Sequence, residues 1–295
     1  MRALRRKGSG CWSRGVGNEA ILLLTMISFF PSRAIAISVL GFDVHWYGIL
    51  YLASFILAYL LLPRLQKYRG VSLTKDQWGD ILTWSVIGVL VGGRLGYVLL
   101  YDPRYFLSHP LEIIAVWKGG MASHGGFLGV TLALLYMSRK HKISLLALAD
   151  IAVIPVAIGL ALGRFGNFIN QELYGNVTTL PWGMSFPGAE GLRHPTQIYA
   201  IGKDLFIALV CFLHLRMSSR PKGQTAGIFL VLYGVLRFLL EFLRENTHSM
   251  FEVGVLELSR GQWYSVPIVI VGIGVLMWGW RKKYRFPFLS VISDK

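Results

Sequence analysis

The chain has 295 residues, of which 54% are hydrophobic and only 15% are charged, and its mean hydropathy is +0.53. This composition excludes an ordinary soluble domain of this length and indicates an integral membrane protein. Lys and Arg outnumber Asp and Glu by 30 to 15. The cations lie in short runs between apolar segments, without the basic helix or aromatic signature of a nucleic-acid-binding protein, so we expect no nucleic-acid partner.

Apolar segments of membrane-crossing length recur along the chain, since a helical crossing needs about 20 mostly apolar residues. Seven such segments lie near residues 46–62, 80–100, 121–138, 145–163, 197–215, 225–243 and 263–280. We therefore predict an all-α, polytopic membrane protein with about seven transmembrane helices.

The connections between these segments alternate in Lys and Arg content, which sets the orientation of membrane helices. One set of connections is rich in cations: Arg64, Lys67, Arg69 and Lys75; Arg139, Lys140 and Lys142; Arg216, Arg220 and Lys222; Arg281, Lys282, Lys283 and Arg285. The other set holds only Arg104, Lys118, Arg164, Arg193, Arg244 and Arg260. Because the cation-rich side is normally cytoplasmic, we predict an N-terminus outside and a C-terminus in the cytoplasm.

Residues 1–25 fit this topology poorly, because their cations would lie on the outer side. They are either the basic region of a signal peptide or extra anchor, or they precede a translation start at Met26. We favour the start at Met26. The chain then divides into an N-terminal extension at 1–25, a single transmembrane domain at 26–285 and a C-terminal tail at 286–295.

Charged side chains interrupt several of the apolar segments, and two of them carry stripes of polar residues. An arginine near the bilayer centre costs about 2.5–3.5 kcal/mol, so such a residue normally faces the protein interior or a wet cavity. Arg94, Tyr97 and Tyr101 share one helical face. A second stripe with the same spacings consists of Tyr233, Arg237, Glu241 and Arg244. The alternative for the first stripe is an aromatic interface belt with a snorkelling arginine. For the second stripe it is an Arg237–Glu241 pair that neutralises itself.

The third segment opens with His124 beside Gly125 and Gly126. These glycines lower helix propensity and open the backbone around the imidazole, although a satisfied structural histidine is the alternative. In the second segment, glycines at 88, 92 and 96 have the spacing that lets transmembrane helices pack closely. Lys203 and Asp204 in the fifth segment are adjacent, so they face different directions, and we assign them no role.

The fourth segment ends in a polar motif, GRFGNFINQELYG, at residues 163–175. With the predicted topology, polar residues from separate segments fall on the outer half of the membrane: Tyr47, Arg94, Tyr97, His124, Arg164, Asn167, Glu172, Arg193, His194, Arg237 and Glu241. Independent structural exceptions would scatter over both leaflets. We therefore predict one polar cavity, open to the outer side, whose arginines bind an anion such as a phospholipid headgroup.

The outer side carries no run of His, Asp or Glu with metal-ligand spacing, and the two cysteines, Cys11 and Cys211, support neither a disulfide framework nor a thiolate metal site. We expect neither a metal nor a cofactor.

The motif at 163–175 closely resembles the signature of the bacterial prolipoprotein diacylglyceryl transferases. Five further blocks resemble family blocks, in family order: HWYG at 45–48, GGRLGY at 92–97, GGMASHGG at 119–126, RHPTQ at 193–197 and RFLLEFLR at 237–244. The resemblance covers roughly residues 45–280. It implies transfer of a diacylglyceryl group from phosphatidylglycerol to the lipobox cysteine of a preprolipoprotein. It also implies a bacterial inner-membrane location with the active site toward the periplasmic leaflet.

The resemblance also implies roles for single residues. His124 is the expected base, and Arg164 and Arg237 are expected to bind phosphate and to stabilise the leaving group. Asn167 and Glu172 are expected to organise the motif. Further substrate-binding residues are Tyr47, Tyr97 and Glu241. His194 or a substrate-assisted route would serve equally as the source of the base.

A transporter or flippase for anionic lipids would also place arginines in a membrane cavity. It should show internal repeats and polar residues that continue into the inner leaflet, and the sequence shows neither pattern. A structural scaffold without a reaction leaves the outer arginines unexplained.

Overall fold

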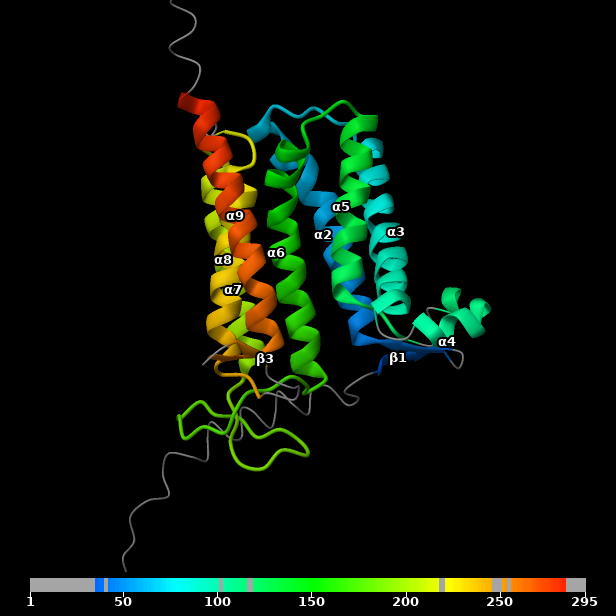
Figure 1. Cartoon of the computed structure of the whole chain (residues 1–295), viewed down its shortest axis with the longest axis vertical. Helices are drawn as coiled ribbons and strands as arrows, with labels where there is room; N and C mark the ends of the chain where they lie inside the picture. Colours follow the sequence, from blue (N-terminus) through cyan, green and yellow to red (C-terminus); the bar gives the residue numbers. More distant parts are fainter. Residues whose placement is uncertain are drawn as a thin grey trace, which may run out of the picture.

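The computed structural model of the chain describes residues 35–39, 42–100, 103–115, 119–217, 221–245, 251–253 and 256–284. Its long helices are α2 (Trp46–Leu65), α3 (Lys75–Leu100), α5 (Ser123–Lys140), α6 (Leu145–Ile169), α7 (Thr196–Leu215), α8 (Gln224–Glu241) and α9 (Arg260–Tyr284). These helices lie side by side in a bundle (Figure 1).

Shorter elements lie at the ends of the bundle. The helical ones are η1 (Gln66–Arg69), α4 (Pro103–Ser108) and η2 (Pro110–Ile114). The strands of the described residues form two antiparallel hairpins, β1 (Ile35–Val39) with β2 (Phe42–His45) and β3 (Phe251–Val253) with β4 (Leu256–Leu258). With so little sheet, the predicted all-helical class is confirmed.

Six helices in the described ranges are long and apolar enough to cross a membrane: Trp46–Arg69, Lys75–Leu99, Leu145–Ile169, Thr196–Leu215, Gln224–Glu241 and Gly261–Trp280. The chain is therefore a multi-pass membrane protein. The segment predicted near 121–138 corresponds to α5, which is not among these six, so a seventh crossing stays a prediction. The extension at 1–25, the start at Met26 and the tail at 286–295 lie outside the described residues.

The bundle has two ends (Figure 1), and the residues at these ends differ in charge. At the first, which we call the basic end, α2, α5, α7 and α9 finish and α3, α6 and α8 begin. The described cations of the cation-rich connections lie there: Arg64, Lys67, Arg69, Lys75, Arg139, Lys140, Lys142, Arg216 and Lys222. At the second, which we call the site end, α2, α5, α7 and α9 begin and α6 and α8 finish. The alternation in the sequence thus separates two ends of one bundle.

The buried apolar core lies toward the basic end. Its largest fully buried side chains include Trp78, Ile81, Met137, Leu148 and Leu215. These residues come from four different helices and meet near the basic-end termini of those helices. The largest buried apolar side chains therefore gather toward the basic end, and the polar pocket described below lies toward the opposite end.

A buried ion pair completes this packed half. The Arg69 guanidinium donates to the Asp150 carboxylate at 2.7 Å and to the Thr225 hydroxyl at 2.7 Å. The same carboxylate accepts from the backbone N–H groups of Gly223 and Ala226, each at 2.8 Å, where it satisfies donors at the start of α8. These bonds tie η1, α6 and α8 together at the basic end.

Glycines bring α3 and α5 into close contact, as the spacing in the sequence predicts. A Cβ on Gly88 would lie 2.6 Å from the Gly129 carbonyl oxygen, and a Cβ on Gly96 would lie 2.8 Å from the Gly125 Cα. A Cβ on Gly92 would overlap the Gly125 carbonyl group. Gly125 therefore has a packing role that the sequence alone does not predict.

Candidate active site

Helix α6 carries the first half of the polar motif. The sequence predicts that the fourth span ends near residue 163, but the helix continues to Ile169. The apolar run stops where the polar residues begin, whereas the helix does not. Arg164 and Asn167 are three residues apart and share one face, and the Arg164 guanidinium donates to the Asn167 side-chain oxygen at 3.3 Å.

A tight turn follows α6 and folds the second half of the motif back toward the helix. Gln171 and Leu173 both adopt left-handed backbone conformations, with φ of 56° and 60°. Such conformations are disfavoured for residues with a side chain, so they require support from the surrounding structure. Here the Glu172 N–H donates to the Asn167 carbonyl at 3.0 Å, and the Gln197 side chain donates to the Glu172 carbonyl at 2.7 Å.

The turn places the Glu172 carboxylate in a hydrogen-bonded network with α2 and α6. The Tyr47 hydroxyl, in the first turn of α2, donates to this carboxylate. The Asn167 amide donates to the Tyr47 hydroxyl and, at 2.9 Å, to the Glu172 carboxylate. Tyr47, Asn167 and Glu172 therefore form one network, and its bond from Arg164 to Asn167 fixes the position of that arginine.

The end of the motif contacts the chain that follows α8. Gly175 pairs with Arg244 in an isolated antiparallel bridge, and the Asn176 N–H donates to the Leu243 carbonyl at 2.9 Å. A Cβ on Gly175 would overlap this Leu243 carbonyl group, so glycine permits the close approach. The bridge thus brings Arg244 next to the motif.

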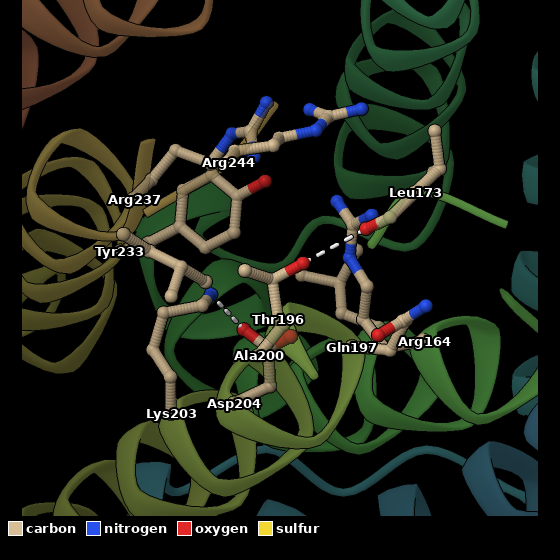
Figure 2. A pocket seen from close by; sticks show the side chains of 12 residues that line it. Arg164, Leu173, Thr196, Gln197, Ala200, Lys203, Asp204, Tyr233, Arg237 and Arg244 are labelled. Atoms are coloured by element: carbon tan, nitrogen blue, oxygen red, sulfur yellow. Dashed lines mark hydrogen bonds and ion pairs between the residues drawn. The ribbon is translucent and has the colours of Figure 1, made fainter. Parts of the chain in front are cut away.

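A pocket opens beside this network (Figure 2). Arg164 enters it from α6, Arg237 enters it from α8, and Arg244 enters it from the segment after α8. The structure therefore brings together the two arginines that the sequence places in one cavity. Among the described residues, the lining is Leu160, Arg164, Leu173, Thr196, Gln197, Ala200, Lys203, Asp204, Tyr233, Arg237, Leu240 and Arg244.

Glu241 lies between two of these arginines. Its carboxylate is 3.1 Å from the Arg237 guanidinium and 3.7 Å from that of Arg244. The Arg237–Glu241 pair that the sequence offers as an alternative does form. Arg237 nevertheless lines the pocket, so the ion pair does not exclude this arginine from the site. Burial lowers the pKa of Arg244 from its ordinary value, and the Glu241 carboxylate opposes this shift.

Lys203 and Asp204 lie in the same pocket, which the sequence did not predict. The Lys203 ammonium pairs with the Asp204 carboxylate and lies 4.5 Å from the centre of the Tyr233 ring. Both side chains are nearly fully buried. Adjacent helical positions do face different directions, but the long lysine side chain bends back to its neighbour. The apolar stretch around the two charges was the available signal for a functional position.

Arg94 and Tyr97 lie apart from the pocket lining. Arg94 is buried and donates to four backbone carbonyl groups, those of Glu112, Ile113, Gly119 and Gly120. Tyr97 packs edge-on against Phe106 at 6.2 Å. Both side chains therefore hold the segment that connects α3 to α5. The snorkelling arginine considered from the sequence is wrong for Arg94, because backbone carbonyls and not solvent surround its guanidinium.

Three residues of the predicted outer cluster remain: His124, Arg193 and His194. His124 lies in the first turn of α5, and its side chain is outside the described part of the structure. The His194 ring is 3.3 Å from the Tyr199 hydroxyl. Arg193 pairs with Glu245 at 2.9 Å. Neither Arg193 nor His194 lines the pocket.

The pocket is suited to an anion. Four cationic side chains and one carboxylate line it, and Glu241 adds a second carboxylate beside the arginines. Guanidinium groups offer paired donors that match phosphate or carboxylate oxygens, and low-dielectric surroundings strengthen that interaction. Among the described residues there is no group of three His, Cys, Asp or Glu side chains placed to hold a metal ion.

Fold and site together define a helical membrane protein with a cation-lined pocket at one end of its bundle. A family model described as prolipoprotein diacylglyceryl transferase matches residues 34–278. The chain belongs to this family, and it is a transferase.

Curated relatives agree with this assignment. The phosphatidylglycerol–prolipoprotein diacylglyceryl transferase of Nitrosomonas europaea is 44% identical over 251 residues, which are 84% of this chain and 90% of that protein. The enzyme of the same name from Dechloromonas aromatica is 42% identical, over 84% of this chain and 96% of its own length. That of Bordetella avium is 40% identical, over 89% of this chain and all of its own length. None of these three carries a transporter name.

Proposed function

We propose that this protein transfers the diacylglyceryl group of phosphatidylglycerol to the lipobox cysteine of a preprolipoprotein. The products are a thioether-linked lipid and glycerol phosphate. The observation that carries the proposal is the meeting of Arg164, Arg237 and Arg244 in one pocket. The names of the curated relatives support the choice of substrates.

In this reaction Arg164 and Arg237 hold the lipid phosphate. The cysteine sulfur attacks the lipid glycerol carbon that carries the phosphate, so an S–C bond forms and a C–O bond breaks. The electron pair of the broken bond stays on the phosphate oxygen, and the departing glycerol phosphate gains negative charge. Fixed guanidinium groups stabilise that charge without reorganising during the reaction.

The attacking sulfur is a thiolate, because the thiol is a much weaker nucleophile and its pKa of about 8.5 leaves it mostly protonated at neutral pH. We assign His124 as the base that takes the thiol proton. Tyr47, Asn167 and Glu172 hold Arg164 in place through the network described above. Glu241 positions Arg237 and Arg244. Tyr97 orders the α3–α5 connection through its contact with Phe106.

The orientation follows from charge. The basic end faces the cytoplasm, so the site end faces the periplasmic leaflet of the bacterial inner membrane. Helix α5 is the seventh crossing, because it packs along α3 through the glycine contacts. Phosphatidylglycerol of the outer leaflet and the lipobox segment of a secreted precursor then reach the pocket from the same side.

The test is a transfer assay with the purified full chain, phosphatidylglycerol and a lipobox peptide. We expect the peptide mass to increase by one diacylglyceryl unit. Arg164→Ala should abolish this increase, because it removes a pocket guanidinium. Arg104→Ala is the matched control, since Arg104 is an exposed arginine at the same end of the bundle, and it should retain full transfer.

Two outcomes would contradict the proposal. An unmodified peptide together with movement of labelled lipid across the bilayer would indicate a flippase. Equal transfer by the wild-type chain and by Arg164→Ala would remove the pocket from the mechanism.

A further inference from the structure

One side-chain oxygen of a pocket residue accepts no hydrogen bond from the described part of the chain. Gln197, in the first turn of α7, is 1% exposed and lines the pocket (Figure 2). Its amide nitrogen donates to the Glu172 carbonyl at 2.7 Å, whereas its amide oxygen is buried and accepts no hydrogen bond within the described structure. A buried acceptor without a donor is destabilising, so such an atom calls for a donor from a ligand.

The orientation of this amide is fixed. Turning it over would bring the Gln197 oxygen against the Glu172 carbonyl oxygen, and two acceptors would then face each other. The nitrogen therefore stays on Glu172, and the buried oxygen is the atom that lacks a donor.

Gln197 lies nearer the site-end terminus of its helix than Arg164 and Arg237 lie to those of theirs. Arg164 lies five residues before the end of α6, and Arg237 lies four residues before the end of α8. At about 1.5 Å per residue, these arginines lie roughly 6–8 Å inside the site end. Gln197 lies at the very start of α7, also at the site end. The part of a phospholipid that lies outward of its phosphate is its headgroup.

The charge of the pocket selects among headgroups. Four cationic side chains and one carboxylate line it, so a headgroup that carries an ammonium group is disfavoured by like-charge repulsion. A trimethylammonium headgroup is also cationic and has no N–H or O–H to donate. A neutral polyol has hydroxyl donors and adds no charge.

We propose that Gln197 is a specificity-determining residue that accepts a hydrogen bond from a hydroxyl group of the glycerol headgroup. This inference rests on the proposed function, because it names the headgroup that the same pocket takes. The Gln197 side chain would then have two roles. Its amide nitrogen supports the turn at Glu172, and its amide oxygen binds the lipid headgroup.

The test compares phosphatidylglycerol with phosphatidylpropanol, which carries the same phosphate charge and no headgroup hydroxyl. For the wild-type chain we expect kcat/KM to favour phosphatidylglycerol by about 10- to 100-fold, because the analogue leaves the Gln197 oxygen unpaired. Gln197→Met should reduce this preference to within about threefold, mainly through slower transfer from phosphatidylglycerol.

Thr196→Val is the matched control. Thr196 lines the same pocket and donates to the Leu173 carbonyl at 2.8 Å, so its side chain supports the turn through a backbone contact. We expect this variant to slow both lipids equally and to keep the wild-type preference. An equal slowing of both lipids by Gln197→Met would show a structural role only and would overturn the inference.

Equilibrium binding of the two lipids to the purified wild-type chain supplies a readout that needs neither turnover nor a folded variant. Tighter binding of phosphatidylglycerol supports the inference, and equal binding overturns it. Failure of the proposed function has a different signature, namely no transfer to the peptide from either lipid.

Discussion

Arg94 and Arg237 have similar positions in the sequence pattern but different partners in the structure. Each is an arginine near the outer end of an apolar segment, one turn from an aromatic or acidic residue on the same face. Periodicity predicts which face a side chain occupies, but it does not predict what lies opposite that face. Arg94 meets backbone carbonyls, whereas Arg237 meets Glu241 and the pocket.

The two arginines should therefore respond differently to substitution. Arg94→Ala leaves several buried carbonyls without their donor, so we expect the free energy of unfolding to fall by about 3 kcal/mol. Arg237→Lys keeps the charge but loses the paired donors, so transfer should fall about 10-fold or more at unchanged thermal stability. Thermal unfolding and the transfer assay on the same preparations separate these effects. Loss of stability in Arg237→Lys with normal specific activity would contradict the assignment.

The network around Glu172 gives a second prediction at this scale. Tyr47→Phe removes the hydroxyl that donates to the Glu172 carboxylate. A hydrogen bond to a charged group contributes about 1.5–3 kcal/mol, so we expect transfer to fall by about 10-fold or more. Tyr51→Phe is the matched control, because Tyr51 stacks on Tyr47 at 6.2 Å and is 57% exposed. Equal transfer rates for the two variants would exclude a role for the network.

At the level of the helix, the sequence predicts the existence of the long elements well and their ends less well. The apolar run of the fourth segment stops at residue 163, but α6 continues through Arg164 and Asn167 to Ile169. A count of apolar residues ends the helix too early when the helix continues through polar residues beside a pocket. The left-handed turn at Gln171 and Leu173 was unpredictable for a related reason, because only tertiary contacts hold those conformations.

Glycine spacing predicted that α3 packs closely against another helix, but not that the partner is α5, and this contact can be tested directly. Gly92→Ala places a methyl group against the Gly125 carbonyl, so we expect the thermal midpoint to fall through overpacking that costs about 1–3 kcal/mol. Gly274→Ala in α9 is the matched control, since a Cβ there meets nothing within 4 Å. Equal thermal midpoints for both variants would mean that the two helices do not pack as closely as described.

For the whole molecule, charge distribution predicts which end of the bundle faces which compartment. Single cysteines can report this in a chain whose Cys11 and Cys211 are replaced by alanine. Glu190→Cys at the site end should react with a membrane-impermeant maleimide on intact spheroplasts. Lys222→Cys at the basic end should react only after permeabilisation. The reverse labelling pattern would show that the predicted orientation is wrong and that the pocket lies on the cytoplasmic side.

The sequence predicted that polar residues would gather at one end of the bundle, and the structure shows why only some of them share a pocket. Arg164 and Arg237 line the same pocket because α6 and α8 both contact α7 there. Arg94 does not reach the pocket, because α3 pairs chiefly with α5. Lys203 received no role, because its apolar surroundings do not show which helices face it, and Gln197 entered only as the last residue of the block at 193–197. Helix neighbours, which the sequence pattern leaves open, decided each of these cases.

The central claim is that Arg164 and Arg237 together hold the phosphate of a lipid. The most direct measurement is an experimental density map of the purified protein with bound phosphatidylglycerol. We predict that the lipid phosphate lies within about 2.7–2.9 Å of both guanidinium groups, as in charge-assisted hydrogen bonds. A phosphate bound elsewhere, with an empty pocket between α6 and α8, would contradict the account.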